Sequence, residues 1–136
     1  MKRGALLFVL ILGILALVAC APKPEEVNAV VTEFWTQWKA NNPAGMVATM
    51  AAEVDFGIMA SKGVPAMDLA VLLVDDLPVD PSFTFSIITT ELYDGYAVVE
   101  GAIDPDPTPG NEIEMTVHLR DTDDGWKICF VALGIL

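Results

Sequence analysis

Basic side chains are scarce in this sequence, and their scarcity excludes several classes of partner. The 136-residue chain has 7 Lys and Arg against 19 Asp and Glu, which gives a net charge of −12 at pH 7. Lys2 and Arg3 precede every acidic residue, so the remainder of the chain is more acidic still. Proteins that bind DNA, RNA or anionic lipid surfaces present basic patches. We therefore expect no nucleic acid partner, and the length fits one domain.

Histidine and cysteine are also few, which limits the metal and redox chemistry. The chain has one His and two Cys, with neither a Cys-x-x-Cys pair nor spaced histidines, so carboxylates alone remain as metal ligands. Residues 121–125 resemble a calcium loop but lack its later bidentate acid, which favours an ordinary acidic turn. Glycine-rich phosphate loops and nucleophile elbows are absent as well. We expect no metal and no cofactor.

The N-terminus has the pattern of an export signal. After Met1, Lys2 and Arg3, residues 4–19 contain no charged or polar side chain, and as a helix they would rise about 24 Å, short of a hydrocarbon core of about 30 Å. This is typical of a secretory signal peptide and not of a membrane span. The sequence Leu-Val-Ala-Cys that ends at Cys20 resembles the lipobox of bacterial lipoproteins.

The lipobox resemblance implies a lipid-anchored protein. In that family the cysteine is lipidated and the preceding peptide is removed, so residues 1–19 would be the signal peptide and Cys20 the first mature residue. Residues 20–24, with two prolines, would form a short tether. Ala21 in place of Asp implies export to the outer membrane where the cell has one. The alternative is an ordinary signal peptide cut near Ala19 or Ala21.

Hydrophobic periodicity predicts three helices in the first half of the remaining chain, over residues 25–41, 43–53 and 65–77. The first carries an apolar stripe at helical spacing: Val27, Val31, Phe34, Trp35 and Trp38. The second is expected to turn four side chains inward: Met46, Val47, Met50 and Val54. The third is apolar nearly all round, so we expect it to be largely buried or to line a cavity.

Alternation with a period of two then predicts four strands, over residues 83–93, 96–103, 112–120 and 126–133. Asp94 and Gly95 form the favoured hairpin dipeptide, and three prolines make residues 104–110 a loop. The third strand alternates most clearly, with four apolar side chains on one face: Ile113, Met115, Val117 and Leu119. Helices followed by antiparallel strands indicate an α+β domain with the helices packed on one face of the sheet.

Two local motifs resemble the nuclear-transport-factor-2-like (cystatin-like, cone-shaped) superfamily over residues 25–136. The first helix ends in Phe-Trp-x-x-Trp and is followed by Asn-Pro, a Met-rich helix and the run Ala-Glu-Val-Asp-Phe that ends at Phe56. The last strand opens with Asp-Gly-Trp-Lys-Ile at Asp124. The resemblance implies N-terminal helices packed on a curved antiparallel sheet, with an apolar pocket at the mouth of the cone. Family members include isomerase-like and cyclase-like enzymes and many non-catalytic binding domains.

Asp55 is the one candidate catalytic residue. The resemblance places it where the chain of family members enters the pocket, and a carboxylate held in an apolar pocket can serve as a proton-transfer base. The competing interpretation is a turn aspartate that makes local hydrogen bonds.

Aromatic and methionine side chains are the candidates for a ligand-binding surface. The residues that we expect to line the pocket are Trp35, Trp38, Met46, Met50 and Met67. Methionine adapts to irregular ligands, although aromatic and methionine stripes on helices more often form the core.

The remaining polar candidates favour structural roles. His118 shares a strand face with Glu114, Thr116 and Arg120 and is expected to be solvated. Tyr93 and Tyr96 flank the hairpin turn, where aromatic residues pack across strands or donate to a ligand oxygen. Glu100 lies on the Tyr96 face and would point inward only if paired. Cys129 is expected to be a small buried hydrophobe.

Together these features predict a cell-envelope protein, held to the membrane by lipid on Cys20, whose domain binds a small apolar ligand or a partner without catalysis. One alternative is an isomerase-, dehydratase- or cyclase-like enzyme that uses Asp55 with a tyrosine donor. Another is a structural partner of an envelope assembly. The sequence leaves open whether the protein forms a homodimer.

Overall fold

The computed structural model describes residues 22–57, 61–105 and 110–135, in which three helices and six strands are formed. The predicted signal peptide, Cys20 and most of the predicted loop at 104–110 lie outside the described residues. No helix in the described part is long and apolar enough to cross a membrane. The elements follow the order α2 (Pro24–Lys39), α3 (Pro43–Val47), β1 (Met50–Phe56), β2 (Ser61–Pro65), α4 (Ala66–Asp76), β3 (Thr84–Tyr93), β4 (Tyr96–Asp104), β5 (Ile113–Thr122) and β6 (Gly125–Ile135).

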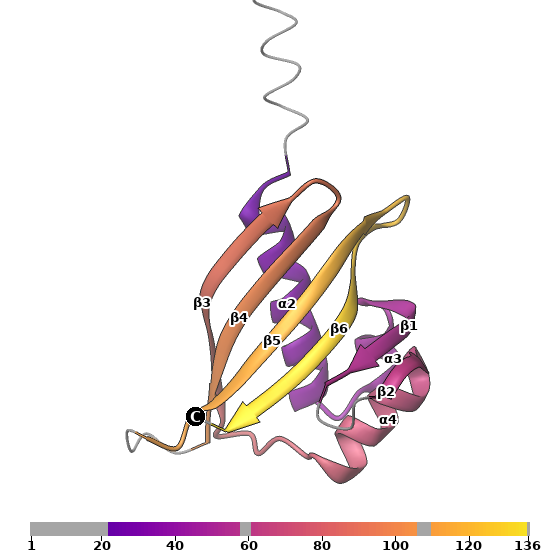
Figure 1. The fold of residues 1–136 in the computed structure, drawn as a ribbon. Helices are drawn as coiled ribbons and strands as arrows, with labels where there is room; N and C mark the ends of the chain where they lie inside the picture. Colours follow the sequence, from indigo (N-terminus) through magenta and orange to yellow (C-terminus); the bar gives the residue numbers. More distant parts are fainter. Residues whose placement is uncertain (1–21, 58–60, 106–109, 136) are drawn as a thin grey trace, which may run out of the picture.

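The six strands form one curved sheet in the order β2-β1-β6-β5-β4-β3, with α2 crossing its inner face (Figure 1). Every neighbouring pair is antiparallel except β1 and β6, which run parallel. The prediction of an antiparallel sheet is therefore correct for the other pairs and wrong at this one. β1 and β6 are separated by most of the chain, so nothing in the local sequence indicates their relative direction.

The second predicted helix is too long, and the two strands that follow it were missed. Helix α3 ends at Val47, and the residues expected to continue it form β1. Thr49 ends the helix by donating its Oγ1 proton to the Met46 carbonyl at 2.6 Å. The Thr49 carbonyl in turn accepts from the Ile128 amide at 2.9 Å, which directs the chain into the sheet beside β6. β2 then pairs antiparallel with β1.

The apolar stripe of the first helix is confirmed. All five stripe residues are buried against the inner face of the sheet: Val27, Val31, Phe34, Trp35 and Trp38. The alternation predicted for residues 112–120 also holds, because Met115, Val117 and Leu119 are fully buried in the same core. Helix and sheet therefore share one hydrophobic core.

Helix α4 is buried on one face only, which corrects the expectation of a largely buried helix. Its buried residues are Ala66, Leu69, Ala70 and Leu73. Met67 and Val71 point the other way and are 46% and 40% exposed. Leu and Ala fill the contact with the rest of the core, and Leu72 and Val74 are partly buried beside it, so Met67 and Val71 are left facing solvent.

The two hairpin turns and the start of α2 lie at one end of the sheet (Figure 1). Both turns depend on glycine in the left-handed region, since φ is 70° at Gly95 and 93° at Gly125. We call this the turn end. The opposite end, where Ile103, Ile113 and Leu133 meet the C-terminal end of α2, is the mouth of the cone.

Candidate functional site

A small cavity, the mouth cavity, opens at the mouth of the cone. It has a volume of about 120 Å³. Eight residues line it: Trp38, Leu77, Pro78, Val79, Phe83, Ile103, Ile113 and Leu133. None of these side chains is titratable. Among the described residues, the cavity therefore offers apolar surface and no group that could move a proton.

Trp38 forms a fixed wall of the mouth cavity. Its ring is 2% exposed and packs edge-on against Trp35, with the ring centroids 5.8 Å apart. The indole Nε1 donates to the carbonyl oxygens of both Leu73 and Leu77, each at 3.1 Å. These bonds satisfy the one polar group of the side chain, so Trp38 presents only apolar surface.

The segment between α4 and β3 closes the cavity on its other side. Lys39 Nζ donates to the Phe83 carbonyl at 2.9 Å and ties this segment to the end of α2. Within the segment, Asp80 Oδ1 accepts from the amide and the hydroxyl of Ser82, and these bonds lower the pKa of Asp80. The walls are thus held by hydrogen bonds outside the cavity. An apolar cavity of about 150 Å³ binds benzene in another protein. A ligand group about the size of benzene therefore matches the mouth cavity.

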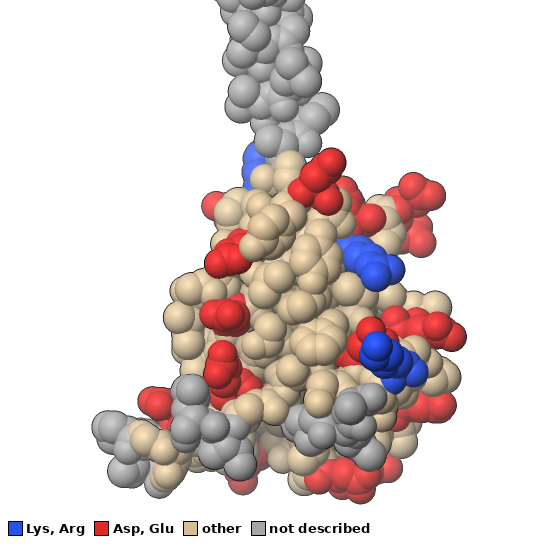
Figure 2. Space-filling view, viewed as in Figure 1, with Lys and Arg blue, Asp and Glu red and all other residues tan. Residues whose placement is uncertain are grey.

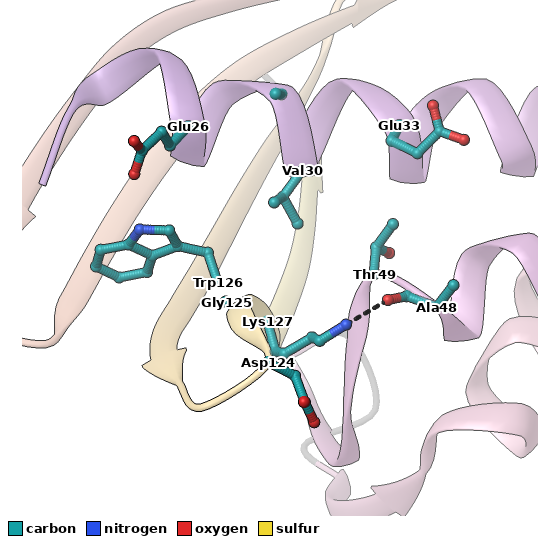
Figure 3. A pocket seen from close by; sticks show the side chains of 10 residues that line it. Glu26, Val30, Glu33, Ala48, Thr49, Asp124, Gly125, Trp126 and Lys127 are labelled. Carbon is teal, nitrogen blue, oxygen red and sulfur yellow. Dashed lines mark hydrogen bonds between the residues drawn. The ribbon is translucent and has the colours of Figure 1, made fainter.

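A larger and more open hollow, the α2 groove, lies along the N-terminal half of α2 (Figure 3). It has a volume of about 430 Å³. Helix α2, the end of α3 and the start of β6 line it: Glu26, Ala29, Val30, Glu33, Ala48, Thr49, Asp124, Gly125, Trp126 and Lys127. Lys127 is the one cation among the described lining residues, and its Nζ donates to the Ala48 carbonyl at 2.7 Å. The groove therefore combines an apolar floor with an acidic rim.

Asp55 lies away from both hollows. On β1 its neighbours Val54 and Phe56 are buried in the core, and Asp55 points to the opposite face of the sheet. Its Oδ1 accepts from the Gly63 amide on β2 at 2.7 Å. A shallow recess of about 140 Å³ beside it also contains Lys62 and Phe130. Asp55 thus makes a hydrogen bond to the neighbouring strand β2, and a catalytic role for it stays a prediction.

The outer face of the sheet carries few charges at its centre, while acidic side chains gather along its β3 side (Figure 2). In the centre, the rings of Tyr96, His118 and Phe130 pack in a row, with centroids 5.4 Å and 4.5 Å apart. Tyr96 Oη is hydrogen-bonded to His118 Nδ1. The expectation of a solvated His118 is therefore wrong: cross-strand rings half-bury it, and this burial lowers its pKa.

The other polar candidates also lie on this outer face. Tyr93 packs on Tyr96 and donates its hydroxyl proton to Glu91, which raises the pKa of Tyr93. Glu100 is exposed and accepts from Thr89 at 3.2 Å. Cys129 is half-buried here, and its burial raises the pKa of the thiol. The face is held together by contacts among its own side chains.

Of the five residues predicted to bind a ligand, Trp38 alone lines the mouth cavity, the α2 groove or the recess beside Asp55. Trp35, Met46 and Met50 are buried in the core, and Met67 is exposed on α4. A ligand role for these four stays a prediction. The α2 groove is not predictable from local sequence, because its walls come from three separate segments. The one feature of the sequence that could have indicated the groove is the spacing of Glu26 and Glu33, which places both on one face of the helix.

No metal-binding cluster is found within the described part of the chain, where no three His, Cys, Asp or Glu side chains gather closely enough. The acidic segment at 121–125 forms the turn between β5 and β6. Thr122 Oγ1 donates to the Gly125 carbonyl at 2.7 Å and accepts from the Asp124 amide at 3.2 Å. These contacts are those of a hairpin turn.

Comparison with known proteins identifies the fold. No protein-family model and no curated protein sequence matches the chain. Among solved structures, an NTF2-like protein of unknown function from Methylobacillus flagellatus aligns with a TM-score of 0.65 and 12% identity, over 82% of this chain and 90% of that one. A candidate dehydratase of the NTF2-like family from Streptomyces avermitilis has a TM-score of 0.65 and 16% identity, over 82% and 94%.

A third similar structure is a cystatin-like domain of unknown function from Nostoc punctiforme, with a TM-score of 0.62 and 10% identity over 81% of this chain and 75% of that one. At these identities the similarity concerns the fold and not the activity. The chain has the NTF2-like, cystatin-like fold that its motifs resembled.

Proposed function

We propose that this protein is a lipid-anchored component of the bacterial cell envelope whose domain binds the apolar end of a small ligand without catalysing a reaction. The observation that supports binding is the mouth cavity, which is lined by apolar side chains throughout its described wall. Transfer of apolar surface into such a cavity is favourable by about 25 cal/mol per Å². The ligand should therefore carry a compact hydrocarbon or aromatic group that enters the mouth cavity.

The absence of catalysis is supported by where the titratable groups lie. Asp55, the candidate base, is on the opposite face of the sheet from the core and is bonded to Gly63. His118 and Tyr96 also face outward and bond to each other. A general base must come within hydrogen-bond reach of its substrate proton, and none of these groups lines the mouth cavity.

Lipid anchoring is supported by the sequence that ends at Cys20. Because Pro24 begins α2 at the turn end of the sheet, a tether of residues 20–23 would hold that end close to the bilayer (Figure 1). The 16 residues of α2 span about 24 Å, so the mouth would point away from the membrane. A cavity in that position can receive a ligand from the aqueous side.

Benzene is a suitable probe of the proposed binding. In titration calorimetry with the purified protein, we expect saturable binding with a negative heat-capacity change, the signature of apolar burial. Ile113→Trp adds a ring inside the mouth cavity and should abolish binding. Ala102→Trp adds the same ring on the outer face of the neighbouring strand and should leave it unchanged. Benzene binding that survives Ile113→Trp would contradict the proposal.

The anchor has a separate test. Cys20→Ser removes the only side chain that the lipobox pattern would acylate, so we expect unprocessed precursor or protein released from the membrane. Cell fractionation distinguishes these forms from the wild type. Retention of a normally processed Cys20→Ser protein in the membrane would contradict lipidation.

A further inference from the structure

The α2 groove has the charge of a site for a cationic ligand. Glu26, Glu33 and Asp124 line it and are all exposed. Glu33 Oε1 accepts from Gln37 Nε2 at 2.6 Å, but a carboxylate has further acceptor sites, so all three side chains can meet a partner. Where the structure describes the lining, Lys127 is its one cation, and the ammonium group is already bonded to the Ala48 carbonyl. The groove is therefore negative on balance, within a strongly acidic domain.

The spacing of two of these carboxylates sets the length of the ligand. Glu26 and Glu33 are seven residues apart on α2, nearly two full turns, so they lie on one side of the helix about 10.5 Å apart along its axis. Val30 lies between them and points into the groove (Figure 3). A ligand lying along α2 would meet a carboxylate, an apolar surface and a second carboxylate in turn.

Trp126 adds a hydrogen-bond donor to the groove, so the ligand should carry an acceptor as well as positive charge. Its side chain is only 8% exposed, and the indole nitrogen is on the ring edge that faces α2 across the groove (Figure 3). This N–H takes part in none of the hydrogen bonds formed among the described residues, in contrast to the N–H of Trp38, which has two acceptors. No buried side-chain nitrogen or oxygen of the described residues lacks a hydrogen-bond partner, so this N–H is open to water in the groove. A ligand that supplies an acceptor can replace that water.

We propose that the α2 groove binds an extended basic segment of a partner protein. In a polyproline II helix, residues three apart share one side and are about 9.3 Å apart, so two Lys or Arg at this spacing reach Glu26 and Glu33. A backbone carbonyl between them accepts from the Trp126 N–H, and the apolar stems of the basic side chains lie over Val30. A protonated polyamine matches the charges but offers no acceptor.

The probe peptide acetyl-Lys-Pro-Pro-Lys-amide tests the charge pairing by calorimetry. Each exposed ion pair contributes a factor of about two to five, so Glu26→Gln/Glu33→Gln together should weaken binding about tenfold. The matched control is Glu25→Gln/Glu53→Gln, which removes the same charge outside the groove and should leave the dissociation constant within about twofold. Equal weakening in both double variants, or none in either, would overturn the proposal.

Trp126→Phe tests the hydrogen bond, because it removes the N–H and keeps an aromatic ring. We expect about fivefold weaker binding of the peptide, the effect of one hydrogen bond, and no change in the binding of spermidine. Since Trp126 is largely buried, its variant is checked for native melting, and the glutamate variants test the site without it. Spermidine binding as tightly as the peptide, or a peptide affinity unaffected by Trp126→Phe, would rule out a peptide as the occupant.

Discussion

The mouth cavity and the α2 groove lie along the same helix and differ in volume, in charge and in the hydrogen bonding of their tryptophans. The mouth cavity is small, its described lining is uncharged, and the polar atom of Trp38 is fully bonded. The groove is more than three times larger by volume, has an acidic rim and contains the N–H of Trp126, which has no acceptor among the described residues. The difference shows that one helix supplies a hydrophobic wall at its C-terminal end and a charged wall near its N-terminus. The two hollows should therefore respond to different ligands and conditions.

Truncation of Trp38 should have a larger effect than any other substitution in the two hollows. Trp38→Ala removes a buried ring that forms both core and cavity wall, which costs about 3–5 kcal/mol of unfolding free energy. Urea denaturation measures this loss. Trp126→Phe is the comparison in the groove and should cost much less, because most of the ring volume is kept. A similar loss of unfolding free energy in the two variants would mean that Trp38 is no more important for stability than the Trp126 wall of the groove.

Ionic strength should separate the two hollows without any mutation. Raising the salt from about 0.01 M to about 1 M shortens the Debye length from about 30 Å to about 3 Å. The peptide should then bind the groove several-fold more weakly, because its partners are exposed carboxylates. Benzene has no charge to screen and should bind with the same affinity. Parallel titrations at the two salt concentrations measure both effects, and a common salt response would show that the ligands share one site.

Asp55→Asn should have a modest effect on stability and none on either hollow. The carboxylate accepts one hydrogen bond from Gly63 at the edge of the sheet, so its replacement by an amide costs about 1 kcal/mol or less. Urea denaturation and benzene titration measure the two quantities. If a substrate were found whose turnover collapses in Asp55→Asn, the protein would be an enzyme with a site outside both hollows.

The pH dependence that involves His118 should be the smallest effect. Burial holds its pKa below the usual 6.5, so the unfolded chain takes up a proton before the folded one does. Stability should therefore decline as the pH falls through about 6.5, until the lower folded pKa is reached. Thermal melting between pH 7.5 and pH 5 should show this decline, and His118→Gln should reduce it. A decline of the same size in His118→Gln as in the wild type would mean that His118 does not cause it.

Most of the fold could be predicted because its elements have clear local periodicity. The stripe of α2 and the alternation of β5 each bury one side, and those positions are the ones that the core contains. Local periodicity does not predict β1 and β2, because both are short. The helical spacing of apolar residues before β1 also continues into it through Met50 and Val54. The parallel pairing of β1 with β6 depends on contacts between distant parts of the chain, which local patterns do not encode.

The candidate site was less predictable, for a related reason. Trp38 was identified because it belongs to the stripe of α2, but the same stripe also includes Trp35, which lines no described hollow. Residue type alone predicts a ligand contact for Met67, but in the structure this side chain faces solvent because Leu69 and Leu73 occupy the core face of α4. The groove depends on the approach of Trp126 to α2. Such an approach follows from tertiary packing alone.

The central claim is that two separate sites recognise different chemistry, and each site contains its own tryptophan. The most direct test follows the indole N–H resonances of Trp38 and Trp126 by NMR while benzene and acetyl-Lys-Pro-Pro-Lys-amide are added in separate titrations. Benzene should shift the Trp38 signal and leave that of Trp126 in place, and the peptide should do the opposite. If either ligand moves both signals equally, or moves only the tryptophan of the other site, the account is contradicted.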